Sequence, residues 1–102
     1  MATKVFYKQD NKGNYFYIII KGHADFADKG KDIVCAAISA ITNGAVNFLQ
    51  TNYGDCCKIS CNSAEISIYL QNNNPECQLV LKLMLYQLKN IEDYYPNYLK
   101  IN

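Results

Sequence analysis

The sequence predicts a small α+β domain in which an antiparallel or mixed sheet of four to five strands packs against two helices. Three observations predict it: two strand-like segments around a polar turn, helical periodicity from Ile33, and then a second strand pair followed by a second helical segment. With 102 residues the chain can bury one core but not two. We therefore expect one domain, residues 1–102, with the order ββαββα and either a last strand or a tail.

The first two segments predict a β-hairpin. Residues 5–8 form a short strand-like stretch, and residues 10–14 are dense in turn-forming side chains. Residues 15–21 (YFYIIIK) then return as the partner strand. Because this second stretch is apolar nearly throughout, it is typical of a strand that is central in its sheet or covered on both faces.

A long helix is predicted from Ile33 to about Gln50. Apolar residues recur along one helical face of this segment, at Val34, Ala37, Ile38, Ile41, Ala45, Phe48 and Leu49. Asp32 directly precedes the segment, and its carboxylate is expected to cap the first turn. The polar residues 23–31 are expected to form a loop, with Gly30 as its hinge.

The second half of the chain predicts another hairpin and another helix. Apolar and polar residues alternate over 57–61 and again over 65–70, as in two strands that share one apolar face. Asn74 is expected to cap the second helix, with Pro75 at the first helical position and a leucine-rich body over 79–91. Residues 98–101, after Pro96, form either the last short strand or a tail.

Composition favours a soluble globular protein. Half of the residues are hydrophobic, 19% are charged, and the net charge is +1. The apolar runs look too short to cross a bilayer and no leader is visible, so we expect a cytoplasmic protein without a membrane partner. All ten basic residues are lysines scattered along the chain, which indicates no direct contact with nucleic acid.

The five cysteines are expected to be reduced thiols. Their number is odd and no secretion signal accompanies them, so a full disulfide framework is not expected. Cys56, Cys57 and Cys61 lack the paired short spacing of zinc sites, and we expect neither a metal nor another cofactor. These three and Cys77 are interpreted as buried structural thiols.

Two cysteines occupy positions that favour a reactive thiolate. Cys35 is the third residue after its expected cap, and unpaired N–H groups in a first helical turn lower the pKa of a thiol. Cys77 stands three residues after Asn74 and meets the same condition. Helix position alone therefore does not select the nucleophile.

His23 is the only histidine, and it stands where a base for Cys35 would be needed. It follows the second strand, and one loop separates it from the helix that carries Cys35. Imidazole suits both proton removal and proton return near neutral pH. Each residue also has a structural explanation: packing for Cys35, a surface or capping position for His23, capping for Asp32, and a backbone hydrogen bond for Ser39. From the residues alone both interpretations stay open.

The stretch GHADFADKGKDIVCAAISAI, residues 22–41, resembles the signature of the ribosomal-processing cysteine proteases, the Prp family. That signature has Gly-His-Ala at a strand end and Gly-x-Asp-Ile-Val-Cys-Ala-Ala at the start of a helix. The order of elements and the chain length resemble the family as well. The matching residues include Gly22, His23, Ala24, Gly30, Asp32, Cys35 and Ser39.

The resemblance implies a homodimeric cysteine endopeptidase with Cys35 as nucleophile and His23 as base. Its substrate would be the N-terminal extension of large-subunit ribosomal protein twenty-seven. The remaining residues of the signature would support the site as strand end, hinge, cap and rim. A thiol redox sensor using Cys35 and a non-catalytic ribosome-assembly module are the alternatives.

Overall fold

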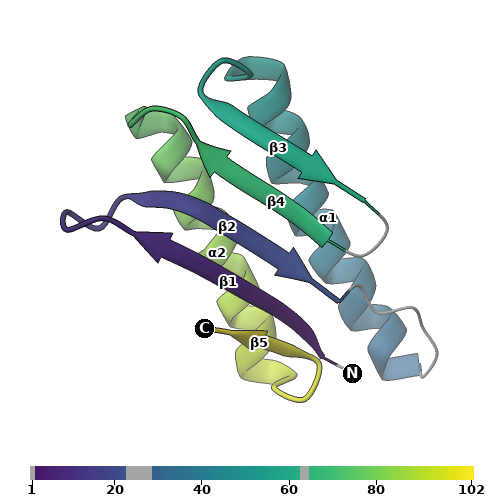
Figure 1. Cartoon of the computed structure of the whole chain (residues 1–102). Coiled ribbons are helices and arrows are strands. Elements are labelled where there is room, and N and C mark those ends of the chain that lie inside the picture. The colour runs from purple at the N-terminus through teal and green to yellow at the C-terminus, as the bar shows by residue number, and fades with distance from the viewer. Residues whose placement is uncertain (1, 23–28, 63–64) are drawn as a thin grey trace.

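A five-stranded mixed sheet forms one layer of the molecule, and two helices packed on a single face of it form the other (Figure 1). This computed structural model describes residues 2–22, 29–62 and 65–102, and of residues 29–32 the backbone only. The elements in chain order are β1 (Thr3–Gln9), β2 (Tyr15–Lys21), α1 (Lys29–Asn52), β3 (Cys57–Cys61), β4 (Glu65–Leu70), α2 (Pro75–Tyr94) and β5 (Leu99–Ile101). The predicted fold class and element order are confirmed, and residues 99–101 form a strand.

The strands lie in the order β3-β4-β2-β1-β5. All neighbours are antiparallel except β1 and β5, which run parallel. β2 is central, as its apolar sequence predicts, but only one of its faces is covered by helices (Figure 1). Ile18 and Ile20 are buried, whereas Tyr17 and Ile19, which point to the other face, are only partly buried. Of the two alternatives that the sequence left open, the central position is confirmed, and cover on both faces is not found in the part of the chain that the structure describes.

The core fills the space between the sheet and the helices. From α1 it receives side chains at helical spacing, which lie on one stripe of the helix: Val34, Ile38, Val46 and Leu49. From α2 it receives Cys77, Leu81, Met84, Leu85 and Leu88. The strands contribute residues of one face only, among them Val5, Ile18, Ile20, Ile66, Ile68 and Leu99.

By length and composition, residues Ile33–Asn52 of α1 are apolar enough to cross a bilayer, with a mean hydropathy of 1.4. The expectation that every apolar run is too short does not hold for this helix. Its buried stripe packs in the core described above, and we assign it to that core.

The start of α1 differs from the prediction. The helix begins at Lys29, so Gly30 and Asp32 lie inside it, and the expected loop hinge and helix cap are wrong. The sequence gives little warning, because residues 29–31 include two lysines, which are good helix formers, and a single glycine costs only about 1 kcal/mol in a helix. The end, at Asn52, lies two residues beyond the expected one.

The start of α2 agrees with the prediction. Asn74 precedes Pro75, and its side-chain Oδ1 accepts hydrogen bonds from the backbone N–H groups of Glu76 (2.8 Å) and Cys77 (3.2 Å). The helix continues to Tyr94. The cap therefore fixes where α2 begins, and the predicted body, residues 79–91, lies within it.

Candidate active site

The end of β2 is held in place by Gly22 and Thr3. Gly22 has φ +82°, a conformation that side chains other than glycine's rarely adopt. A Cβ atom there would lie 3.2 Å from the carbonyl oxygen of Ala2. The buried Thr3 donates a hydrogen bond from Oγ1 to the Gly22 carbonyl oxygen at 3.1 Å. The direction in which the chain leaves the sheet toward residue 23 is thus set by contacts with the start of β1.

Cys35 is partly exposed and follows the buried Val34. It is the seventh residue of α1, whereas the sequence had placed it in the first turn. Only the first four N–H groups of a helix lack intrahelical partners, and the effect of the helix dipole is concentrated in the first turn. The expected help from the helix start is therefore weaker at Cys35 than predicted.

Ser39 lies one turn after Cys35 and is also partly exposed. Thr42, buried one turn after Ile38, donates a hydrogen bond from Oγ1 to the Ile38 carbonyl oxygen at 2.9 Å. Successive residues of a helix are rotated by about 100°, which places Cys35 and Ser39 on one side of the buried stripe of α1 and Ile41 on the other side. Because Ile41 faces α2, these two residues lie on the flank that points away from α2.

The ends of three elements meet near the start of α1 at one edge of the sheet (Figure 1). These are the end of β2, the beginning of β1 and the beginning of β4. There the ammonium of Lys21 lies 3.8 Å from a carboxylate oxygen of Glu65. The chain passes from this edge into residue 23 and returns into α1 at residue 29.

The structure therefore describes only some of the signature residues. It describes Gly22 at the end of β2 and Cys35 and Ser39 on α1, and it places the backbone of Gly30 and Asp32 in the first turn of α1. His23 and Ala24 lie outside the described residues. Thr3, which fixes the carbonyl group before His23, was missed by sequence reasoning because no local pattern connects it with Gly22.

The five cysteines differ in burial. Cys77 is fully buried and Cys57 is 8% exposed, with their Sγ atoms 4.0 Å apart. Burial is the main reason why the pKa of Cys77 rises to about 12, and it also raises the pKa of Cys57. A thiol with so high a pKa is a poor nucleophile at neutral pH, so Cys77 is excluded although it starts a helix.

The other thiols are more accessible. Cys35 and Cys56 are partly exposed and Cys61 is exposed, so the interpretation of Cys61 as a buried structural thiol is wrong. It occupies the last position of β3, which is an edge strand. Of the two cysteines that the sequence singled out, only Cys35 is open to a substrate.

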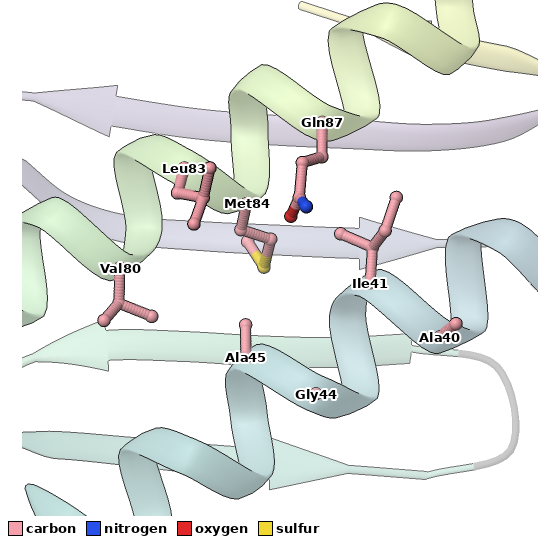
Figure 2. Close-up of a pocket in the computed structure, with 8 residues that line it drawn as sticks. All are labelled: Ala40, Ile41, Gly44, Ala45, Val80, Leu83, Met84 and Gln87. Atoms are coloured by element: carbon pink, nitrogen blue, oxygen red, sulfur yellow. The ribbon is translucent and has the colours of Figure 1, made fainter.

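A groove between the two helices lies on the other flank of α1. Its volume is about 350 Å³, and Figure 2 shows Ile41 of α1 facing Met84 and Gln87 of α2 across it. Because Cys35 lies on the opposite flank, this groove does not lead to its thiol. In the described ranges 2–22, 29–62 and 65–102, no three His, Cys, Asp or Glu side chains are grouped to hold a metal ion.

Comparison with known proteins supplies the chemistry. The family model described as "Cysteine protease Prp" matches residues 1–100. The ribosomal processing cysteine protease Prp of Mycoplasma genitalium is 40% identical over 88 residues, which cover 84% of this chain and 86% of the relative. The relative of the same name from Staphylococcus aureus is 34% identical, with 91% of each chain covered.

Solved structures agree with this result. The crystal structure of the essential ribosomal processing protease Prp from S. aureus with a substrate peptide has a TM-score of 0.88 at 31% identity, covering 98% of this chain and 97% of that one. The same protease with a covalently linked product peptide has a TM-score of 0.87 at 32% identity and the same coverage.

The fold and these relatives define a cysteine peptidase. The chain belongs to the Prp family of ribosomal processing cysteine proteases.

Proposed function

We propose that this protein is a cytoplasmic endopeptidase that removes the N-terminal extension of large-subunit ribosomal protein twenty-seven, with Cys35 as nucleophile and His23 as base. The observation that carries the proposal is the partly exposed Cys35 on α1 in a chain that matches the family from residue 1 to residue 100. The names of the relatives support a ribosomal substrate, and the peptide complexes of the S. aureus protease support a peptide one.

The covalently linked product peptide in the S. aureus relative supports nucleophilic catalysis. In the mechanism that we propose, His23 accepts the proton of the Cys35 thiol, and the thiolate attacks the scissile carbonyl carbon. The tetrahedral intermediate expels the amine of the mature protein, which takes a proton from His23. Water then hydrolyses the thioester and releases the leader with a new carboxyl group.

The start of α1 at Lys29 changes which groups can stabilise the oxyanion. The N–H groups without intrahelical partners belong to residues 29–32, three to six residues before Cys35. If the developing negative charge is stabilised by this helix, the donors are those groups.

We also propose a homodimer that forms through the helix layer. Three large apolar side chains of α2 are exposed, namely Leu79, Leu83 and Tyr86. Leu83 also lines the groove of Figure 2. Exposed apolar patches of this kind are typical of protein interfaces. Replacing Leu83 by Lys should shift the mass measured by light scattering toward the monomer, whereas Lys82→Gln, next to it on α2, should leave the mass unchanged.

The decisive experiment is cleavage of a peptide in which an aromatic-rich leader precedes a small residue. We expect cleavage by the wild-type protein and a loss of at least about 1000-fold in Cys35→Ala and His23→Ala, because each removes a group needed in the chemical step. Cys61→Ala is the matched control, since it removes an exposed thiol outside the proposed pair.

Mass spectrometry of the products locates the cut, and of the enzyme detects the acyl-enzyme on Cys35. Intact peptide with the wild-type protein would refute the assigned substrate. Full activity in Cys35→Ala would refute the nucleophile. A reversible disulfide at Cys35 after peroxide, without cleavage, would favour the thiol redox sensor.

A further inference from the structure

The sheet face opposite the helices is uncovered and has a composition of its own (Figure 1). Side chains alternate between the faces, so the strand register identifies those on the uncovered one. On β1 and β2 they belong to residues paired across the strands: Lys4 with Lys21, Phe6 with Ile19, and Lys8 with Tyr17. The uncovered face thus combines lysines with large apolar and aromatic residues.

The other strands continue the same rows. Tyr17 is paired with Tyr69 of β4, which is paired with Lys58 of β3. One row across the sheet therefore reads Lys8, Tyr17, Tyr69, Lys58. A second row reads Lys100, Lys4, Lys21, Glu65, because each residue is paired with the next across neighbouring strands. We call this surface the lysine–tyrosine face, and it consists of Lys4, Phe6, Lys8, Tyr17, Ile19, Lys21, Lys58, Ser60, Glu65, Ser67, Tyr69 and Lys100.

The charge on this face is strongly positive. It holds five of the ten lysines and a single acidic residue, Glu65, which lies 3.8 Å from Lys21. The whole chain has a net charge of only +1. The lysines that are scattered along the sequence are therefore gathered by the sheet register, which removes the reason for expecting no nucleic-acid contact.

The aromatic side chains lie between these lysines. The rings of Tyr17 and Tyr69 are stacked, with their centroids 5.5 Å apart and an interplanar angle of 11°. Tyr69 is 46% exposed. Beside it, Lys58, Ser60, Tyr69 and Gln71 line a cavity of about 360 Å³, whose walls are mainly the apolar parts of these side chains. A flat ligand with a negative charge nearby fits such a surface.

The charge decides between occupants. A second copy of this chain docked face to face would bring like charges together, which is unfavourable. Single-stranded RNA brings phosphates for the lysines and bases that stack on exposed aromatic rings, a combination that open sheet surfaces use for binding RNA. We propose that the lysine–tyrosine face binds single-stranded RNA, with Lys8 and Lys58 contacting phosphates on either side of a base stacked at Tyr69.

The test is fluorescence anisotropy with a labelled ten-nucleotide oligouridine and the full-length protein. Electrostatic binding of this kind gives dissociation constants of about 1 to 100 µM. The logarithm of the binding constant falls with the logarithm of the salt concentration, with a slope of about −0.7 for each phosphate neutralised. Lys21 lies close to Glu65, and the other four lysines of the face can each neutralise one phosphate. The log–log slope should therefore be no steeper than about −3. Lys58→Gln should make it shallower by about 0.7.

Matched variants separate this face from the rest of the surface. Tyr69→Ala should weaken binding by about 5- to 100-fold, the range for losing one stacked base, and Tyr69→Phe should preserve it. Tyr94→Ala and Lys82→Gln make the same changes at exposed positions of α2, on the helix layer, and should have no effect. Cys35→Ala should bind RNA like the wild type, so the result is independent of the proposed protease mechanism.

Three outcomes would overturn the proposal. One is the absence of RNA binding by folded wild-type protein at low salt. Another is an equal loss of affinity in the α2 variants and in the face variants. In the third, polyglutamate or anionic lipid vesicles displace the labelled oligouridine as well as unlabelled RNA does at equal charge. Polyglutamate would then indicate an acidic protein as the partner of the face, and the vesicles would indicate a membrane surface.

Discussion

Burial at Cys77 cancels what a helix start normally does for a thiol. The Cys77 N–H donates to the Asn74 cap at 3.2 Å, so the residue lies in the first turn, yet its side chain has no exposure. Removal of the thiolate from water outweighs the helix dipole, and the pKa rises. Position along a helix can be predicted from sequence, but the burial that decides reactivity depends on which strands lie opposite.

The raised pKa of Cys77 predicts a loss of stability in alkali. The unfolded chain releases this proton near pH 9, whereas the folded protein keeps it until about pH 12. The free energy of unfolding should therefore fall as pH rises through this interval, by about 1.4 kcal/mol per pH unit from this thiol alone. Its contribution is fully present below about pH 9.

Urea unfolding at about pH 8 and about pH 10 measures this effect. The stability difference between wild type and Cys77→Ala should shrink by about 1 to 1.5 kcal/mol over that interval, because only the wild type carries the thiol. Cys61→Ala, which removes an exposed thiol, should show no such change. A difference for Cys77→Ala that is constant with pH would contradict the prediction.

Gly22→Ala tests how the end of β2 is held. The positive φ should cost about 1 to 2 kcal/mol with a side chain present, in addition to the crowding against the Ala2 carbonyl oxygen. Peptide cleavage should fall as well, since the chain direction before His23 changes. Gly44→Ala is the control: nothing lies within 4 Å of a Cβ there, and this helical site should gain about 0.5 to 1 kcal/mol. Similar urea midpoints for the two variants would refute this account.

At the scale of elements, capping residues explain both a correct and an incorrect helix boundary. Asn74 and Pro75 signal the start of α2 locally, and the structure confirms it. Lys29, Gly30 and Lys31 contain no cap signal, and Asp32 offered a false one. Sequence reasoning thus located the helix that carries Cys35 but placed the residue in the wrong turn, which changes the candidate oxyanion donors.

Removing the cap of α2 tests the element directly. Asn74→Ala leaves the N–H groups of Glu76 and Cys77 without their acceptor and should lower the free energy of unfolding by about 1 kcal/mol. Asn73→Ala, at the exposed neighbouring position, should change it by less than about 0.5 kcal/mol. Circular dichroism with urea titration compares the two, and equal stabilities would show that the cap contributes nothing.

At the scale of the molecule, strand order decides features that no local pattern reveals. β5 joins the sheet at its edge beside β1, although they come from opposite ends of the chain. The Thr3 N–H donates to the Tyr98 carbonyl oxygen at 3.0 Å, and the Ile101 N–H donates to Glu92 Oε2 at 2.9 Å. The latter bond is the main cause that lowers the pKa of Glu92. The same long-range pairing gathers the lysines on the uncovered face.

The contribution of β5 to the whole fold can be measured at Leu99. This side chain is fully buried, so Leu99→Ala should cost about 2 to 5 kcal/mol of unfolding free energy. Lys100→Ala changes the exposed next residue, on the other face, and should stay within about 0.5 kcal/mol of the wild type. If urea unfolding found Leu99→Ala as stable as Lys100→Ala, β5 would be a dispensable tail.

The parallel pairing of β1 with β5 also determines where a purification tag can be attached. The first residues lie against Gly22, where a Cβ atom would already meet the Ala2 carbonyl oxygen. The last residue, Asn102, donates its N–H to the Val5 carbonyl oxygen at 2.9 Å, farther along β1. Figure 1 accordingly shows the N-terminus at the edge where α1 begins and the C-terminus away from it. A fusion for purification should be placed after Asn102, because one before Ala2 would lie at the edge where α1, the helix that carries Cys35, begins.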